Sequence, residues 1–293
     1  MSIVGSGASA IQAVPGIVFD RKPASVTVYI RSPAYCVRRG DYLYPTAIRF
    51  AFRLFPFSAR LYRWLIYWSF EMAYPIMWRN SVWSAIATWL FRRWTKEAAG
   101  GRDELVPNET AGCRRILSSD EYFLALRQPG VTVVRGGVVD STSDGLLDDD
   151  GVCRRTDLVI AATGFRTGEY LLGERIPHAY LGMCLPSRPN FFMMYGPNTN
   201  LGHNSIVFQL ECQAGYIAEA IRVALVRGSS RLSVRPTVFN EYVERTREEA
   251  SKLVFAEDCG SWYSRAEGIN SSTSTLSYWW ATRHVDWTDF IVD

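Results

Sequence analysis

The chain has 293 residues, 48% hydrophobic and 21% charged, which excludes a disordered protein and predicts a well-buried globular one. A formal net charge of +3 is too small to indicate nucleic-acid binding. The six cysteines form no Cys-x-x-Cys pair and no His–Cys cluster, so no zinc site is expected. The first residues lack the basic region of a secretory signal, which favours a cytoplasmic location.

A glycine-rich turn follows a short apolar run at the start of the sequence. Its residues have the spacing Gly-x-Gly-x-x-Ala and lead into a predicted helix. In such a turn the first glycine permits a tight bend, the second lets a pyrophosphate approach the backbone, and the alanine lets helix and strand pack closely. The free N–H groups at the helix start attract phosphates. The pattern predicts a dinucleotide site, with a purely structural turn as the alternative; the candidate residues are Gly5, Ser6, Gly7, Ala8, Ser9, Ala10 and Gln12.

The next predicted strand, residues 26–30, ends in Arg31 and Ser32. A dinucleotide site for NAD usually has an acidic residue at this position, to bind the ribose hydroxyls. Arginine instead suits a 2′-phosphate, so we expect an NADPH site with Arg31 and Ser32 on that phosphate. The alternative is a solvated charge at a strand end.

Residues 48–94 are rich in aromatic side chains and arginine and have a helical pattern. Their longest uncharged run, 80–91, is too short to span a bilayer. We expect a helical insert, covering about residues 46–98, that packs on the rest of the protein. Peripheral membrane contact through 48–94 is the alternative, because arginine with tryptophan and phenylalanine is typical of membrane interfaces.

The remaining segments alternate between predicted strands and helices. Buried strands are expected at 131–134, 157–165 and 190–196, and helices at 209–227 and 239–255. This alternation predicts an α/β fold with a mainly parallel sheet.

Six segments, in order along the chain, resemble the flavin-containing monooxygenases and specifically their Baeyer–Villiger branch. The turn at Gly5 resembles the second, NADPH-binding glycine turn of that family. Further resemblances are Arg31-Ser32-Pro33, Gly112-Cys113-Arg114-Arg115-Ile116-Leu117, the 157–165 segment with its Ala-Thr-Gly-Phe end, the 196–205 loop, and Ser261-Trp262-Tyr263 with Gly268 and Asn270.

The resemblance implies roles for particular residues. Arg115 corresponds to the arginine over the flavin that supports negative charge during oxygenation, for which an always-charged guanidinium is suited. Arg114 corresponds to a basic residue on the NADPH 2′-phosphate. The resemblance also places Thr163, Gly164, Phe165, Gly196, Pro197 and Asn198 beside the flavin. It implies FAD and NADPH as cofactors and a ketone or a soft nucleophile as substrate.

The sequence departs from the family in one respect: no second glycine turn follows a strand, so the FAD pyrophosphate has no expected binding turn. We therefore expect a Rossmann-like NADPH-binding domain at 1–150, including the insert, and the C-terminal remainder of a parallel-sheet FAD domain at 151–293. A truncated enzyme and a homo-oligomer that covers the open strands both fit this interpretation. The alternative function is an NADP(H)-binding or flavin-free remnant.

Overall fold

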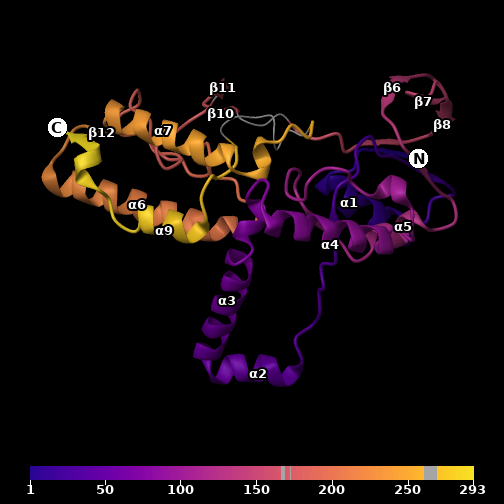
Figure 1. Cartoon of the computed structure of the whole chain (residues 1–293), viewed down its shortest axis with the longest axis horizontal. Helices are drawn as coiled ribbons and strands as arrows, with labels where there is room; N and C mark the ends of the chain where they lie inside the picture. The colour runs from indigo at the N-terminus through magenta and orange to yellow at the C-terminus, as the bar shows by residue number, and fades with distance from the viewer. Residues whose placement is uncertain (166–168, 172, 261–268) are drawn as a thin grey trace. The chain divides into compact units, whose positions relative to one another are not determined.

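The computed structural model describes residues 1–165, 169–171, 173–260 and 269–293 (Figure 1). The chain forms two compact units. The first comprises Met1–Leu43 and Ala85–Arg166, and the second Tyr44–Ser84 and Thr167–Asp293.

The first unit contains a parallel sheet with the strand order β5-β2-β1-β9. At its centre, Ile3 of β1 lies between Val28 of β2 and Ile160 of β9. Apolar side chains of the sheet and of two helices form one buried core, in which Ala10 and Leu126 have almost no exposed surface. This parallel sheet confirms the predicted Rossmann-like α/β class. The elements are β1 (Ser2–Val4), α1 (Ala8–Pro15), the π-helical turn η1 (Gly16–Arg21), β2 (Val26–Tyr29), α5 (Tyr122–Leu126), β5 (Val131–Val134) and β9 (Val159–Ala161).

Besides most of helix α4 (Val82–Ala98), the rest of the first unit consists of smaller elements. Three strands form an antiparallel meander, in which Asp148 is fully buried and accepts a 3.0 Å hydrogen bond from Arg154. The first unit also contains two short parallel strands and a 3₁₀ turn. These elements are β3 (Cys36–Val37), η3 (Asp103–Leu105), β4 (Leu117–Ser118), β6 (Val138–Ser141), β7 (Gly145–Asp148) and β8 (Cys153–Arg155).

The second unit is mainly helical. Tyr216 of its longest helix, α6, packs in an apolar core with Leu232 and Phe290, which belong to an antiparallel strand pair. Its elements are α2 (Thr46–Leu54), α3 (Pro56–Glu71), η2 (Tyr74–Met77), β10 (Glu169–Leu171), β11 (Glu174–Arg175), α6 (Ile206–Arg227), β12 (Leu232–Val234), α7 (Pro236–Ser251), η4 (Val254–Ala256), α9 (Thr275–Thr282), η5 (Trp287–Asp289) and β13 (Phe290–Val292).

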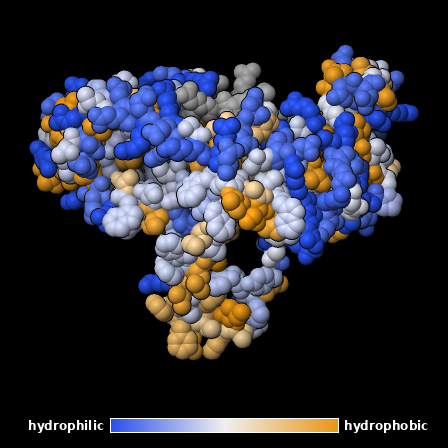
Figure 2. All heavy atoms as spheres, in the orientation of Figure 1, coloured by the Kyte–Doolittle hydropathy of each residue, from blue (hydrophilic) through white to orange (hydrophobic). Residues whose placement is uncertain are grey.

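The predicted insert is helical, with α2 (Thr46–Leu54), α3 (Pro56–Glu71) and α4 (Val82–Ala98). Hydrophobic residues gather on the surface of α2 and α3 (Figure 2), where Phe57 is 74% exposed and Phe50 64%. In the part of the chain that the structure describes, no helix combines the length and the apolar character needed to cross a membrane.

Two predicted strands differ from the structure. Residues 157–165, which we assigned to the second domain, contribute β9 to the first sheet, where it pairs with β1. Residues 190–196 form no strand, and Phe192 makes only an isolated bridge with Cys184. Positive φ angles of 60° at Asn190 and 56° at Tyr195 bend the backbone out of an extended conformation. The first compact unit thus extends past residue 150, to Arg166, and the division into an NADPH-binding and an FAD-binding domain stays a prediction. In the described residues of the second unit, the named strands pair only in antiparallel fashion.

Candidate functional site

The glycine turn at residues 5–7 joins β1 to α1. Gly5 has a φ of 129°, and a Cβ atom there would lie 2.2 Å from the carbonyl oxygen of Ala162. Only glycine fits this position without displacing the backbone that follows β9. Gly7 is different: it has a φ of −80° and a Cβ there would meet no atom within 4 Å. The turn is therefore closed at Gly5 and open at Gly7.

The start of α1 is available to a ligand. Gly7 is its N-cap residue and offers no side-chain cap, so the first N–H groups of the helix lack that partner. Ser9 and Gln12 are exposed, whereas Ala10 is fully buried against the sheet, as the dinucleotide pattern predicts. Uncapped N–H groups and the helix dipole together favour an anion at this position.

A hydrogen bond ties the turn to the end of β2. The Ser6 hydroxyl donates to the carbonyl oxygen of Ser32 over 2.6 Å. The side chain of the neighbouring Arg31 is exposed, and no ion pair to it is found within the described ranges. Sequence reasoning missed Arg135, which directly follows β5 and donates from Nη1 to the carbonyl oxygen of Ile30 over 2.9 Å. Its position after the neighbouring parallel strand was the available signal, because such strand ends meet at one edge of a sheet.

Arg114 and Arg115, to which the family resemblance gives roles, have different surroundings. Arg114 is mostly buried and forms an ion pair with Glu109, with 2.9 Å between Nη2 and Oε1. Arg115 is exposed, and no salt bridge to it is found among residues 1–165 or in the later described ranges. Arg114 must therefore share or leave Glu109 to bind a phosphate, whereas no salt bridge in the described ranges holds Arg115.

Thr163, Gly164 and Phe165 follow β9 and belong to the same unit as the glycine turn. All three are exposed, Phe165 to 86%. The preceding Ala162 packs against the core beside the turn. The structure thus places this segment next to the glycine turn.

The 196–198 turn lies in the second unit and is tightly held. A Cβ on Gly196 would lie 2.3 Å from the carbonyl oxygen of Gly182. The Thr199 hydroxyl donates to the Gly196 carbonyl oxygen over 2.6 Å, and Asn198 has a φ of 61°. The Oδ1 atom of Asn198 is buried, and no donor to it is found within the described chain. A buried acceptor of this kind suits a ligand N–H group.

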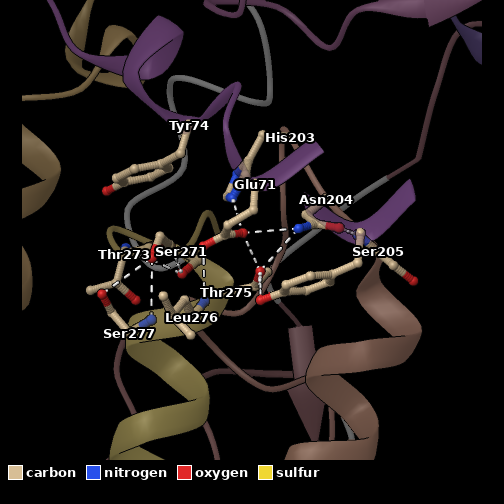
Figure 3. Close-up of polar contacts among 12 residues, drawn as sticks. Glu71, Tyr74, His203, Asn204, Ser205, Ser271, Thr273, Thr275, Leu276 and Ser277 are labelled. Carbon is tan, nitrogen blue, oxygen red and sulfur yellow. Dashed lines mark hydrogen bonds and ion pairs between the residues drawn. The ribbon is translucent and has the colours of Figure 1, made fainter. Parts of the chain in front are cut away.

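Sequence reasoning also missed a buried polar cluster around Glu71, the last residue of α3 (Figure 3). Its carboxylate accepts hydrogen bonds from Asn204 Nδ2 at 2.9 Å, from the Leu276 backbone N–H at 2.9 Å, and from the Thr275 hydroxyl. His203 Nε2 lies 3.6 Å from the carboxylate, and its ring packs on Tyr74. A signal for this cluster was present, since Glu71 is the lone acidic residue between Asp41 and Glu97.

The carboxyl group of Glu71 is held in its charged form. Its residue is only 7% exposed, and burial by itself raises the pKa of a carboxyl group. The nearby His203 ring, together with the hydrogen bonds from Thr275, the Leu276 amide and Asn204, outweighs burial and holds the pKa of the carboxyl group well below its ordinary value. The cluster is therefore an anion surrounded by donors.

Of the C-terminal family pattern, Ser261, Trp262, Tyr263 and Gly268 lie outside the described residues, while Asn270 accepts a 2.7 Å hydrogen bond from Asn200.

Comparisons with known proteins agree with the motifs. No protein-family model matches the chain. The chain is 32% identical over 329 residues to the FAD-binding monooxygenase ktnD of Aspergillus niger, covering 100% of the chain and 52% of the relative. It is 31% identical over 304 residues to a Baeyer–Villiger monooxygenase of Pseudomonas aeruginosa, covering 97% of the chain and 57% of the relative. The chain thus spans just over half the length of these curated relatives.

Solved structures show the same fold. An oxidized steroid monooxygenase bound to NADP superposes with a TM-score of 0.80 at 19% identity, over 99% of this chain and 66% of that one. A closed cyclohexanone monooxygenase gives a TM-score of 0.79 at 18% identity, over 100% and 66%. From its sequence relatives, the chain is a homologue of the FAD-binding Baeyer–Villiger monooxygenases.

Proposed function

We propose that the chain supplies the NADPH site and part of the flavin site of a monooxygenase that acts on a small molecule. The substrate is a ketone, oxidised in a Baeyer–Villiger reaction, or a soft nucleophile. The observation that carries the proposal is the open, uncapped start of helix α1 at Gly7. The same unit exposes Arg31 after strand β2, and the chain is a homologue of these enzymes. NADPH supplies a hydride and bound FAD supplies the oxygen chemistry.

The residues of the first unit fit NADPH. The space beside Gly7 lets a pyrophosphate reach the N–H groups of α1, and Ser6 fixes the turn against Ser32. Arg31 offers an exposed guanidinium for the 2′-phosphate. We assign Arg115 to oxyanion support at the flavin, because an exposed guanidinium can turn toward developing negative charge.

The residues fit FAD only in part. The buried acceptor of Asn198 and the tight turn at Gly196 suit the edge of an isoalloxazine ring, which carries an N–H donor. Within the described ranges, Gly5–Gly7 is the single glycine turn that joins a strand of a parallel sheet to a helix. We therefore assign contacts with the flavin ring to this chain and none with the FAD pyrophosphate. The alternative function is NADP(H) binding without flavin chemistry.

The visible spectrum of the purified chain separates these two functions. With saturating FAD we expect a protein-bound flavin spectrum that NADPH bleaches, because the hydride passes to the flavin. A chain that binds NADPH but leaves all FAD free after gel filtration would instead support the flavin-free alternative.

We also propose peripheral contact of α2 and α3 with an anionic membrane surface. Residues 44–70 contain four arginines and no acidic residue, so their charge complements anionic lipid headgroups. The same helices expose large apolar side chains; these are Phe50, Leu54, Phe55, Phe57, Leu61 and Trp64. This composition is typical of helices that lie in the interface.

Vesicle flotation tests the membrane contact. We expect the chain to float with phosphatidylserine-containing vesicles, and Phe50→Ser with Phe57→Ser to reduce the bound fraction by roughly tenfold, because two deeply inserting side chains are lost. Leu225→Ser on α6, where Leu225 is equally exposed, is the matched control and should float like the wild type. A wild-type chain that stays with the protein fraction would overturn this assignment.

A further inference from the structure

Glu71 joins three segments that are far apart in the sequence. It closes α3, its carboxylate binds Asn204 in the 196–205 loop, and it accepts from the hydroxyl of Thr275 and the N–H of Leu276 at the start of α9 (Figure 3). All three segments belong to the second unit. One side chain thus fixes a loop and a helix start to the end of another helix.

The charge of Glu71 is required by its surroundings. Each carboxylate oxygen faces a donor, and Leu276 N–H belongs to the first turn of α9, where the helix dipole favours an anion. A neutral amide of the same size would turn its N–H group toward Asn204 Nδ2 or toward the Leu276 N–H, which are donors themselves. Hydrogen bonds to a buried charged group stabilise a fold more than those between neutral groups.

The loop held by Glu71 also carries the turn that we assign to the flavin. Thr199 bonds to Gly196, and Asn200 is paired with Asn270 over 2.7 Å. Four residues lie between Asn198, whose buried Oδ1 finds no donor within the described chain, and His203, which faces the carboxylate together with Asn204. A shift of His203 or Asn204 would therefore be passed along a short, internally bonded loop to Asn198.

We propose that Glu71 is a positioning residue, whose negative charge sets the 196–205 loop and the start of α9 in the arrangement that presents Asn198 to its ligand. This rests on the proposed function in naming the flavin ring as that ligand. Tyr67, whose hydroxyl lies 3.1 Å from that of Thr275, and Tyr74, which packs on His203, complete the surroundings. Glu71 itself touches no reacting atom in this assignment.

Hydrogen exchange of the full chain, measured by mass spectrometry, tests the proposal with three variants. Glu71→Gln keeps the volume but loses the charge, and Glu71→Asp keeps the charge but shortens the side chain. If the charge matters, Gln raises exchange in 199–206 and 269–277 by roughly tenfold or more, and Asp recovers most of the protection. Glu211→Gln, which removes an exposed carboxylate 3.5 Å from Arg63, is the matched control and should leave these peptides unchanged.

Two results would overturn the proposal. One is a Gln variant that exchanges like the wild type while Asp does not, which would make Glu71 a space-filling residue. The other is a uniform rise over α6 and β12–β13, which would make it a general stability residue. If Glu71→Gln does not fold, Asn204→Ala, which removes a single donor, must still raise exchange in 269–277 for the proposal to stand.

The absorption of bound flavin tests separately whether Glu71 positions Asn198 for the flavin ring. With added FAD, Glu71→Gln should shift the absorption of bound flavin, and Glu71→Asp should restore it. Absence of bound FAD in the wild type would refute the proposed function, while the exchange result would still decide the role of Glu71 in the loop.

Discussion

Replacing Gly5 with alanine is expected to lower the free energy of unfolding by about 2–4 kcal/mol. The new Cβ would lie 2.2 Å from the Ala162 carbonyl oxygen, at a φ of 129° that alanine rarely adopts. Either the turn or the backbone after β9 must move. Because β1 and β9 are paired in the central sheet, the loss should appear as a lower urea midpoint of the first unit.

Gly7→Ala is the matched control for this prediction. The same methyl group at Gly7 meets no atom within 4 Å, and the φ of −80° suits alanine. We expect a stability change below about 1 kcal/mol, from the weaker N-cap, but a loss of NADPH affinity of roughly tenfold or more, since the methyl occupies the path of the pyrophosphate. Equal destabilisation by the two substitutions would contradict the assignment that Gly5 has no room for a side chain whereas Gly7 has.

Arg31→Ala is expected to weaken NADPH binding by roughly 10- to 100-fold, the value of a charge-assisted contact with a phosphate. NADH lacks the 2′-phosphate, so its affinity should change by less than about twofold. Calorimetric titration of both nucleotides measures the difference. Arg21→Ala, which removes an arginine at the end of η1 in the same unit, is the control and should leave both affinities unchanged.

Equal losses for NADPH and NADH in Arg31→Ala would remove the 2′-phosphate assignment. In that case Arg135, which is anchored on the Ile30 carbonyl, becomes the next cation to test at this edge of the sheet.

The glycine turn could be predicted because its physics is local. The spacing of Gly5, Gly7 and Ala10 fixes a tight bend, an open backbone and a close helix within six residues, and each has the expected burial or space. The residues assigned to bind cofactors remain predictions, but their positions in the turn follow from the pattern. The helical insert was equally visible from its composition.

The long-range features could not be predicted in the same way. The apolar strand at 157–165 fits any parallel sheet, and only the pairing of Ile160 with Ile3, far away in sequence, places it in the first unit. Residues 190–196 looked like a strand because they are apolar, but the positive φ angles at Asn190 and Tyr195 depend on contacts elsewhere, such as Tyr195 N–H with Gln213. The Glu71 cluster unites segments more than 130 residues apart.

The measurement that tests the central claim most directly is a titration of the unmodified chain with NADPH, followed by the fluorescence of the nicotinamide ring. We predict saturable binding that is at least about tenfold tighter than that of NADH, as a 2′-phosphate held by a guanidinium requires. A chain that is folded but binds neither nucleotide, or binds NADH as tightly as NADPH, would contradict the claim that its glycine turn is an NADPH site.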